Sequence, residues 1–253
     1  MENKPLVSII IPVYGCEPYL RETLDSVVAQ TFTDWEAILI NDCSPDNSLD
    51  IAKEYEEKDK RFRVYSHEQN KGAHMARNTA LEYVRGRYIS YLDSDDVWMP
   101  EKLSLQIEFM QKNKVYACIT SYQTVEEDGT YRNTVTVPAK TGYKQMLGNT
   151  LTCTHTAVFD TEKVDKKLLV MPTIGAAEDL ATWLTVMKAG FYFYGLPDVM
   201  AKYRKHGGSR SSNKIRAMKN TWNIYRNIEH LNIFQSAYYF VGYAFHAVKK
   251  RMK

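Results

Sequence analysis

Hydrophobic positions in the first hundred residues follow two alternating periods. A dense β-branched run at residues 7–14 precedes apolar residues at helical spacing, and the same order starts again at residues 35 and 61. A fourth strand pattern spans residues 88–92. Repeated strand and helix units predict an α/β protein with a Rossmann-like, mostly parallel central sheet that helices cover on both faces.

The pattern is less regular in the second part of the chain. Residues 116–122 and 131–137 have strand character on either side of a turn signal, which predicts an antiparallel hairpin. A helix is expected to begin at Glu178 and to end at Gly190. Two further strands are expected at residues 191–194 and 199–203.

Charge and cysteine content exclude several classes of protein. The formal net charge of +3 is too small to indicate a nucleic-acid partner. Four cysteines without CxxC spacing indicate reduced thiols. The first residues lack the apolar stretch of a secretory signal, and no uncharged apolar run is long enough to cross a membrane. We therefore expect a cytoplasmic protein.

The strongest chemical signal is an acidic run at the end of the fourth predicted strand. Asp93, Asp95 and Asp96 would repel one another unless a positive group lay among them. Mg²⁺ or Mn²⁺ with a phosphate-bearing ligand would provide that charge, because these cations prefer oxygen ligands. The alternative is an acidic turn that caps a helix beginning near Pro100.

Polar segments follow each of the four predicted strands. In open α/β sheets, ligands bind at the carboxyl ends of the strands, so these segments should meet in one crevice. They comprise residues 12–17, 41–46, 71–77 and 93–96.

Length and composition fit one continuous domain with an appendage, since 253 residues with 44% hydrophobic content can build a substantial core. We expect this domain at residues 1–212, with a nucleotide-binding half at 1–97 and an acceptor-facing half at 98–212. A C-terminal helical extension is expected at 213–253.

Six short motifs lie at residues 8–14, 41–44, 70–78, 92–96, 178–179 and 203–206. In this order they resemble those of the family 2 glycosyltransferases, which are inverting, metal-dependent enzymes of the GT-A fold. The sequences of residues 219–226 and 238–245 are similar to those of family members that act in teichuronic acid and other surface-polysaccharide synthesis.

This resemblance implies transfer of a sugar from a nucleotide diphosphate, most often a UDP-hexose or UDP-N-acetylhexosamine, to an acceptor hydroxyl. The acceptor implied is a growing, lipid-linked glycan of the bacterial cell surface. By the same resemblance, Asp42 would accept the uracil N3–H, although alone it also fits a helix cap. The residues expected beside the uracil and the nucleoside are Pro12, Val13, Tyr14 and Glu17.

The resemblance also assigns the diphosphate and metal contacts. Asp95 would ligate Mg²⁺ or Mn²⁺, and Asp93 would hold the ribose hydroxyls. His206 would be a second metal ligand or a diphosphate contact, against the alternative of a surface histidine in a glycine-rich loop. The remaining donor contacts implied are Lys71, Gly72, Arg77, Ser94, Asp96, Arg204 and Ser209. Lys71 and Arg77 alone would also fit solvated surface charges.

Asp179 is the expected catalytic base, by resemblance to the family's Glu-Asp pair, with Glu178 beside it on the donor side. A helix start would lower the pKa of Asp179, whereas burial and Glu178 would raise it, and the sequence leaves this open. The alternative for both residues is favourable charge at a helix N-terminus.

The tail at residues 222–253 is rich in aromatic residues and ends in a basic run. It predicts an interfacial helix on the inner leaflet, which would make the protein peripheral on the cytoplasmic face, or a packing helix or homodimer surface.

Two rival functions stay open. One is a sugar-nucleotide nucleotidyltransferase, although residues 12–17 lack its glycine-rich phosphate loop, and the other is an inactive sugar-nucleotide-binding module.

Overall fold

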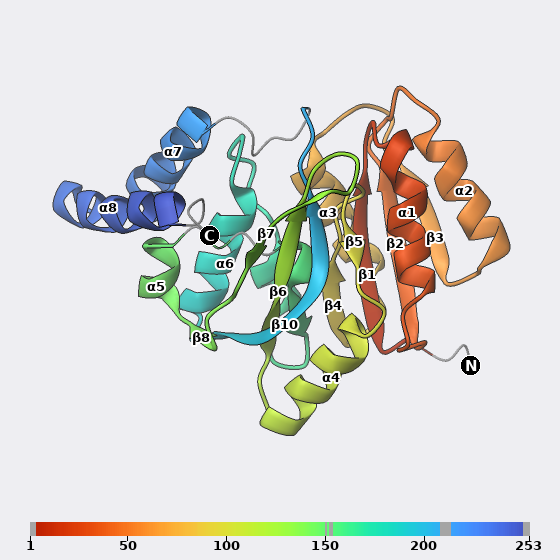
Figure 1. The fold of residues 1–253 in the computed structure, drawn as a ribbon, viewed down its shortest axis with the longest axis horizontal. Helices are drawn as coiled ribbons and strands as arrows, with labels where there is room; N and C mark the ends of the chain where they lie inside the picture. Colours follow the sequence, from red (N-terminus) through yellow and green to blue (C-terminus); the bar gives the residue numbers. More distant parts are fainter. Residues whose placement is uncertain (1–3, 150, 152–153, 208–213, 250–253) are drawn as a thin grey trace.

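A ten-stranded sheet forms the centre of the protein (Figure 1). The computed structural model describes residues 4–149, 151, 154–207 and 214–249. The strands lie in the order β3-β2-β1-β4-β9-β6-β10-β5, with β7 paired to β6 and β8 to β10. The predicted α/β class and mostly parallel N-terminal sheet are confirmed, because β1 pairs in parallel with both β2 and β4, and β2 with β3.

Three strand and helix units and a fourth strand build the first half, as the hydrophobic pattern predicts. Helix α3 starts after Gly72, whose φ of 88° turns the chain in a conformation that disfavours other residues. The elements are β1 (Val7–Val13), α1 (Glu17–Val28), β2 (Trp35–Asn41), α2 (Ser48–Lys58), β3 (Phe62–Ser66), α3 (Ala73–Tyr83) and β4 (Tyr88–Tyr91).

The second half mixes parallel and antiparallel strands. The predicted hairpin is confirmed, since β6 and β7 pair in antiparallel fashion. Helix α6 spans Glu178–Lys188, and Gly190 follows it with a φ of 98°, as expected for a helix end. The other elements are β5 (Val97–Trp98), α4 (Lys102–Asn113), β6 (Ala117–Val125), β7 (Tyr131–Val135), β8 (Lys140–Thr141), α5 (Tyr143–Leu147) and β9 (Val158–Asp160).

One strand differs from its prediction. Instead of two strands, the chain forms a single strand β10 (Phe193–Arg204), which pairs in parallel with β6. Its register shifts between Leu196 and Ala201. Pro197 lies in this stretch and has no N–H to donate, so the strand continues through an irregularity that interrupts the sequence pattern.

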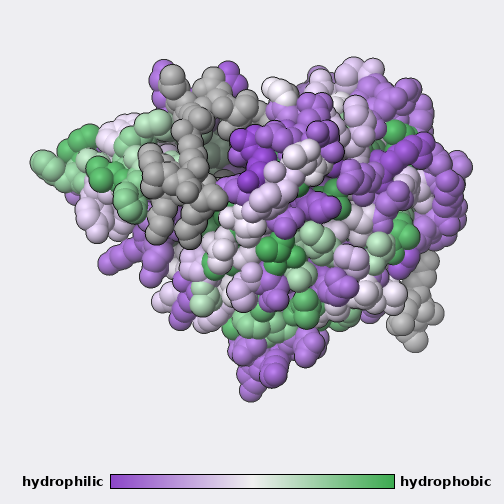
Figure 2. Space-filling view, viewed as in Figure 1, coloured by the Kyte–Doolittle hydropathy of each residue, from purple (hydrophilic) through white to green (hydrophobic). Residues whose placement is uncertain are grey.

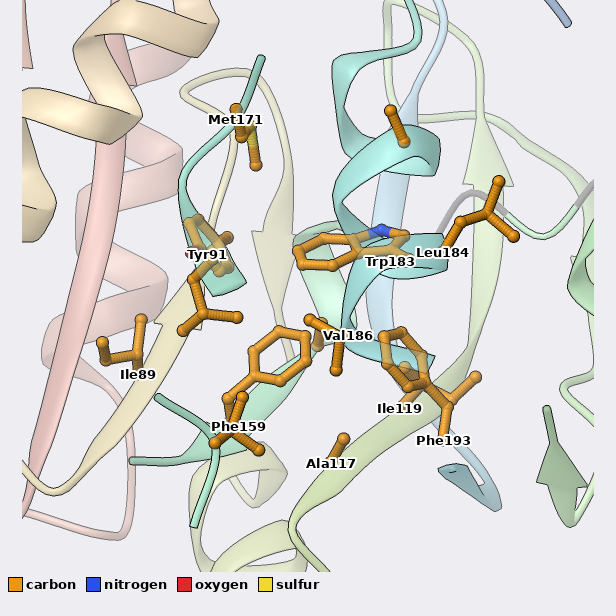
Figure 3. Packing of buried hydrophobic residues seen from close by; sticks show 14 of the residues in the cluster. Ile89, Tyr91, Ala117, Ile119, Phe159, Met171, Trp183, Leu184, Val186 and Phe193 are labelled. Atoms are coloured by element: carbon orange, nitrogen blue, oxygen red, sulfur yellow. The ribbon is translucent and has the colours of Figure 1, made fainter. Parts of the chain in front are cut away.

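Apolar side chains fill both faces of the sheet. On β1, Ile10 packs in the cluster that includes α3 and α6, whereas Ile9 and Ile11 pack in the cluster that includes α1, α2 and α4. Figure 3 shows the aromatic centre of the first cluster, where the Phe159 and Trp183 rings stack with centroids 5.0 Å apart. Helices therefore cover both faces, as predicted.

The predicted helical tail is confirmed. Helix α7 (Lys214–Asn223), a π-helical turn (Ile224–Ile228) and helix α8 (Ile233–Lys249) follow the sheet and lie at the opposite end of the molecule from α1 and α2 (Figure 1). Within the described part of the chain, none of the helices combines the length and apolar character that a membrane crossing needs.

Candidate active site

A cleft of about 640 Å³ opens at the carboxyl ends of β1, β2 and β4. Its walls come from the polar segments predicted to converge, joined by the start of α6 and the end of β10. The predicted site residues that line it are Pro12, Val13, Tyr14, Asp42, Gly72, Arg77, Asp93, Ser94, Asp95, Glu178, Asp179 and His206.

Asp42 is held at the end of β2 by two backbone donors and a histidine ring. Its carboxylate accepts the backbone N–H groups of Lys71 and Gly72 at 2.8 and 2.7 Å, and it lies 2.7 Å from Nδ1 of His67. This loop therefore closes around Asp42, which still lines the cleft. Lys71 contributes its backbone to this arrangement, while its side chain is exposed and outside the cleft lining.

The acidic run divides between the cleft and the interior. Asp93 pairs with Arg77, and Oδ2 of Asp95 lies 2.9 Å from Nε2 of His206. Burial and the neighbouring Asp93 carboxylate raise the pKa of Asp95. Asp96 is fully buried behind the cleft, where burial holds its pKa well above the ordinary value.

Arg204 also lies behind the cleft wall. Its backbone N–H donates to Asp96 at 2.9 Å, and its guanidinium donates to the carbonyls of Asp95 and Glu127 at 3.1 and 2.7 Å and pairs with Glu22. The structure therefore gives Arg204 protein partners and does not bring its side chain into the cleft lining, although it was predicted to contact the donor.

The residues at the mouth of the cleft fit a divalent cation that shares its coordination with a ligand. The described residues contain no group of three or more His, Cys, Asp and Glu side chains arranged to hold a metal. Asp95 and His206 nevertheless present an oxygen and an imidazole donor side by side, and both side chains are partly exposed. Mg²⁺ commonly takes one or two protein ligands and completes its shell with phosphates and water.

Glu178 and Asp179 open helix α6 on the opposite wall. One Asp179 oxygen accepts the N–H of Leu180 at 2.8 Å, and the other accepts the hydroxyl of Thr154 at 3.0 Å. Burial, followed by the charge of Glu178, raises the pKa of Asp179 despite these donors and Arg77. The sequence left open whether the pKa of Asp179 is raised or lowered, and in the structure it is raised. This makes the carboxylate a stronger base than an exposed aspartate.

Besides Lys71, Asp96 and Arg204, two further predicted residues do not belong to the described cleft lining. The carboxylate of Glu17 accepts the backbone N–H and the side-chain amide of Asn47 at 3.1 and 2.8 Å, so it ties α1 to α2 instead. Ser209 lies outside the described residues.

Three residues that line the cleft, Tyr19, Thr154 and His155, lie outside the segments that the sequence predicts for the site. The Tyr19 ring lies 5.1 Å from the His206 ring, His155 stacks on Tyr203 at 5.2 Å, and Thr154 bonds to Asp179. Thr154 and His155 lie in a 3₁₀ turn without hydrophobic periodicity, so the polar run around them is the one signal that could have found them.

A mostly parallel sheet with an acidic cleft at its strand ends has the architecture of the GT-A glycosyltransferases. The chain belongs to the family described as Glycosyl transferase family 2, which matches residues 8–168. It is 42% identical over 250 residues to TuaG of Bacillus subtilis, a glycosyltransferase named for teichuronic acid biosynthesis, and the match covers 98% of each chain. It is 33% identical to the Escherichia coli UDP-Glc:α-D-GlcNAc-diphosphoundecaprenol β-1,3-glucosyltransferase WfgD, over 97% of this chain and 94% of that protein.

Two solved structures that hold nucleotide sugars share the fold. S. aureus TarS 1–349 in complex with UDP-GlcNAc superposes with a TM-score of 0.71 at 23% identity, covering 87% of this chain and 66% of that chain. The mannosyltransferase PcManGT from Pyrobaculum calidifontis, in complex with GDP-Man and Mn²⁺, gives 0.69 at 18% identity, covering 91% and 66%. The predicted GT-A fold is thereby confirmed.

Proposed function

We propose that this family 2 glycosyltransferase moves a hexose or N-acetylhexosamine from UDP to a hydroxyl of a lipid-linked bacterial surface glycan, with inversion. The name of the relative WfgD supports both substrates, because it specifies UDP-Glc as donor and a GlcNAc-diphosphoundecaprenol acceptor. The division into a domain at 1–212 and an extension at 213–253 and a cytoplasmic location belong to the same proposal.

The observation that carries the proposal is the placement of Asp42, Asp95 and Asp179 around one cleft. Asp42 would accept the uracil N3–H beside the strand end at Pro12–Tyr14, and Asp93 would hold the ribose. Gly72 and Arg77 would face the diphosphate, since the first permits close backbone approach and the second carries charge.

Asp179 would perform the proton transfer. Its carboxylate takes the proton of the acceptor hydroxyl as that oxygen attacks the anomeric carbon, and the bond from this carbon to the UDP oxygen breaks on the opposite face. The hydroxyl of Thr154 holds the carboxylate in place during this step. One base suffices, because the diphosphate leaves as an anion and needs no protonated side chain.

Asp95 and His206 would hold Mg²⁺ or Mn²⁺ against the diphosphate. When bound, such a cation neutralises the negative charge that develops on the leaving UDP. Arg204 would contribute by fixing the backbone carbonyl of Asp95, and Asp96 by fixing the backbone of Arg204.

A panel of UDP-, GDP- and dTDP-sugars, offered with a GlcNAc-diphospholipid and read by nucleotide release, tests the function. We expect acceptor-dependent UDP release and a glycosylated lipid of inverted anomeric configuration. Pyrophosphate chemistry would instead support the nucleotidyltransferase, and tight UDP binding without transfer to any acceptor would support the inactive binding module.

A further inference from the structure

The outer face of helix α8 carries an apolar stripe. Phe234, Tyr238, Val241 and Phe245 recur at helical spacing and are 83, 75, 70 and 63% exposed. Figure 2 shows hydrophobic side chains gathered at the end of the molecule that α8 forms. So many large apolar side chains on one exposed face indicate an interaction surface.

Other faces of α8 contact the rest of the protein, so the stripe belongs to a folded surface. Ser236 is fully buried, and a Cβ atom at Gly242 would lie 3.3 Å from the carbonyl oxygen of Gly148. Tyr225, in the turn before α8, is also fully buried, and its hydroxyl donates to the carbonyl of Leu147. The orientation of α8 is therefore set by the rest of the protein.

The charge of the chain changes sign at this extension. Residues 213–253 contain eight Lys and Arg and a single acidic residue, Glu229, whereas residues 1–212 contain 25 basic and 29 acidic residues. The Glu229 side chain is only 1% exposed and is engaged by Lys188 at 3.0 Å and by the Tyr143 hydroxyl at 2.5 Å. The extension thus combines exposed apolar rings with a net charge of +7.

These properties favour an anionic lipid surface over a second copy of the chain. A twofold dimer places the same patch on both subunits, so it would bring together two extensions that each have a net charge of +7 in their sequence. Anionic headgroups attract such a surface, and amphipathic aromatic rings settle at headgroup depth. We propose that the extension seats the protein on anionic lipid, with α8 lying in the interface and its stripe in the acyl boundary.

A second cavity extends from the helices of the C-terminal extension to the candidate base Asp179. It has a volume of about 310 Å³ and is formed by the start of α6 together with α7 and α8, through residues such as Ala177, Ala217, Asn220 and Tyr243. Asp179 lines both this cavity and the donor cleft. On the proposed function, a lipid-linked acceptor held in the same bilayer reaches Asp179 through this cavity.

Vesicle flotation of the full chain tests the proposed binding to anionic lipid. We expect the protein to float with phosphatidylglycerol-containing vesicles, to float much less with phosphatidylcholine alone, and to lose binding as salt rises. Recovery of the variant Phe234→Ser/Tyr238→Ser/Phe245→Ser should fall at least about tenfold. The matched control Tyr131→Ser, at an aromatic residue that is 57% exposed on β7, should float like the natural protein.

Several results would overturn the inference: a natural protein that stays soluble or prefers neither lipid, equal flotation of the triple variant, or a dimer seen by light scattering that the triple variant disrupts. Calorimetric UDP titration of the same preparations separates this inference from the proposed function. Equal UDP affinity in both proteins is expected, and a natural protein that floats but binds no UDP would contradict the donor assignment alone.

Discussion

Asp95 and Asp179 face the same cleft from different electrostatic surroundings. Burial raises the pKa of both, helped by Asp93 at Asp95 and by Glu178 at Asp179, but Asp95 lies beside the His206 imidazole whereas Asp179 accepts the Thr154 hydroxyl. A raised pKa suits Asp179 to accept a proton. At Asp95, the accumulated negative charge would be relieved by a cation.

Replacing the candidate base tests its role. We expect Asp179→Asn to keep UDP affinity and fold, because the amide oxygen can accept the Leu180 N–H and the Thr154 hydroxyl can turn to accept the amide N–H, while kcat falls about 10²–10⁴-fold. Initial rates of UDP release and isothermal titration measure the two effects. Asp198→Asn, at an exposed carboxylate on β10, is the matched control. Turnover near the natural rate in Asp179→Asn would remove the base assignment.

Metal removal tests the Asp95 and His206 pair. Chelation should weaken UDP binding to the natural protein, and Mg²⁺ or Mn²⁺ should restore it, because the cation links protein and diphosphate. Asp95→Ala should bind UDP as weakly as the chelated protein and should no longer respond to either treatment. Asp198→Ala serves as control, and a natural protein whose UDP affinity ignores chelation would contradict the metal assignment.

At the scale of elements, the helices of the extension form one wall of the path to Asp179. Ala217 on α7 lines the second cavity but not the donor cleft, so a larger side chain there should obstruct the acceptor selectively. We expect Ala217→Phe to raise the KM for lipid acceptor at least about tenfold, with UDP affinity unchanged. Steady-state kinetics at varied concentrations of lipid acceptor measure this KM. An unchanged value would show that this cavity is not the acceptor path.

The sequence predicts the elements well where a single period persists. The first three strand and helix units, and hence the meeting of Asp42 with Asp95, follow from regular patterns and from the rule that ligands bind at strand ends. Pro197 interrupts the hydrophobic pattern of β10, so the sequence predicts two strands where the structure has one. The contact of Glu17 with Asn47 could not be predicted, because helix periodicity does not show which neighbouring element a first-turn side chain will contact.

At the scale of the whole molecule, one buried cation couples folding to pH. Lys102 is fully buried, 3.8 Å above the Trp98 ring and 3.1 Å from the Ser90 hydroxyl, and burial lowers its pKa to about 7. The unfolded chain keeps this proton up to a pKa near 10.4. Unfolding therefore takes up a proton above pH 7, and the free energy of unfolding rises with pH there.

Lys102→Met should remove this dependence, since methionine has a similar volume and no charge to desolvate. Between pH 7 and 8.5, the free energy of unfolding of the natural protein should rise relative to that of the variant by up to about 1.4 kcal/mol per pH unit. Urea titrations at several pH values measure the difference, with the exposed Lys112→Met on the same helix as control. Parallel pH profiles for natural protein and Lys102→Met would contradict the prediction.

The Arg204 guanidinium joins parts of the chain that are far apart in sequence. It pairs with Glu22 on α1, 182 positions away, and also holds the backbone of Asp95, while His206 follows it by two residues. A chimera that takes β10 and the following loop from a relative must therefore inherit a compatible partner on α1. Without one, the segment that carries the histidine would lose its ion pair with α1.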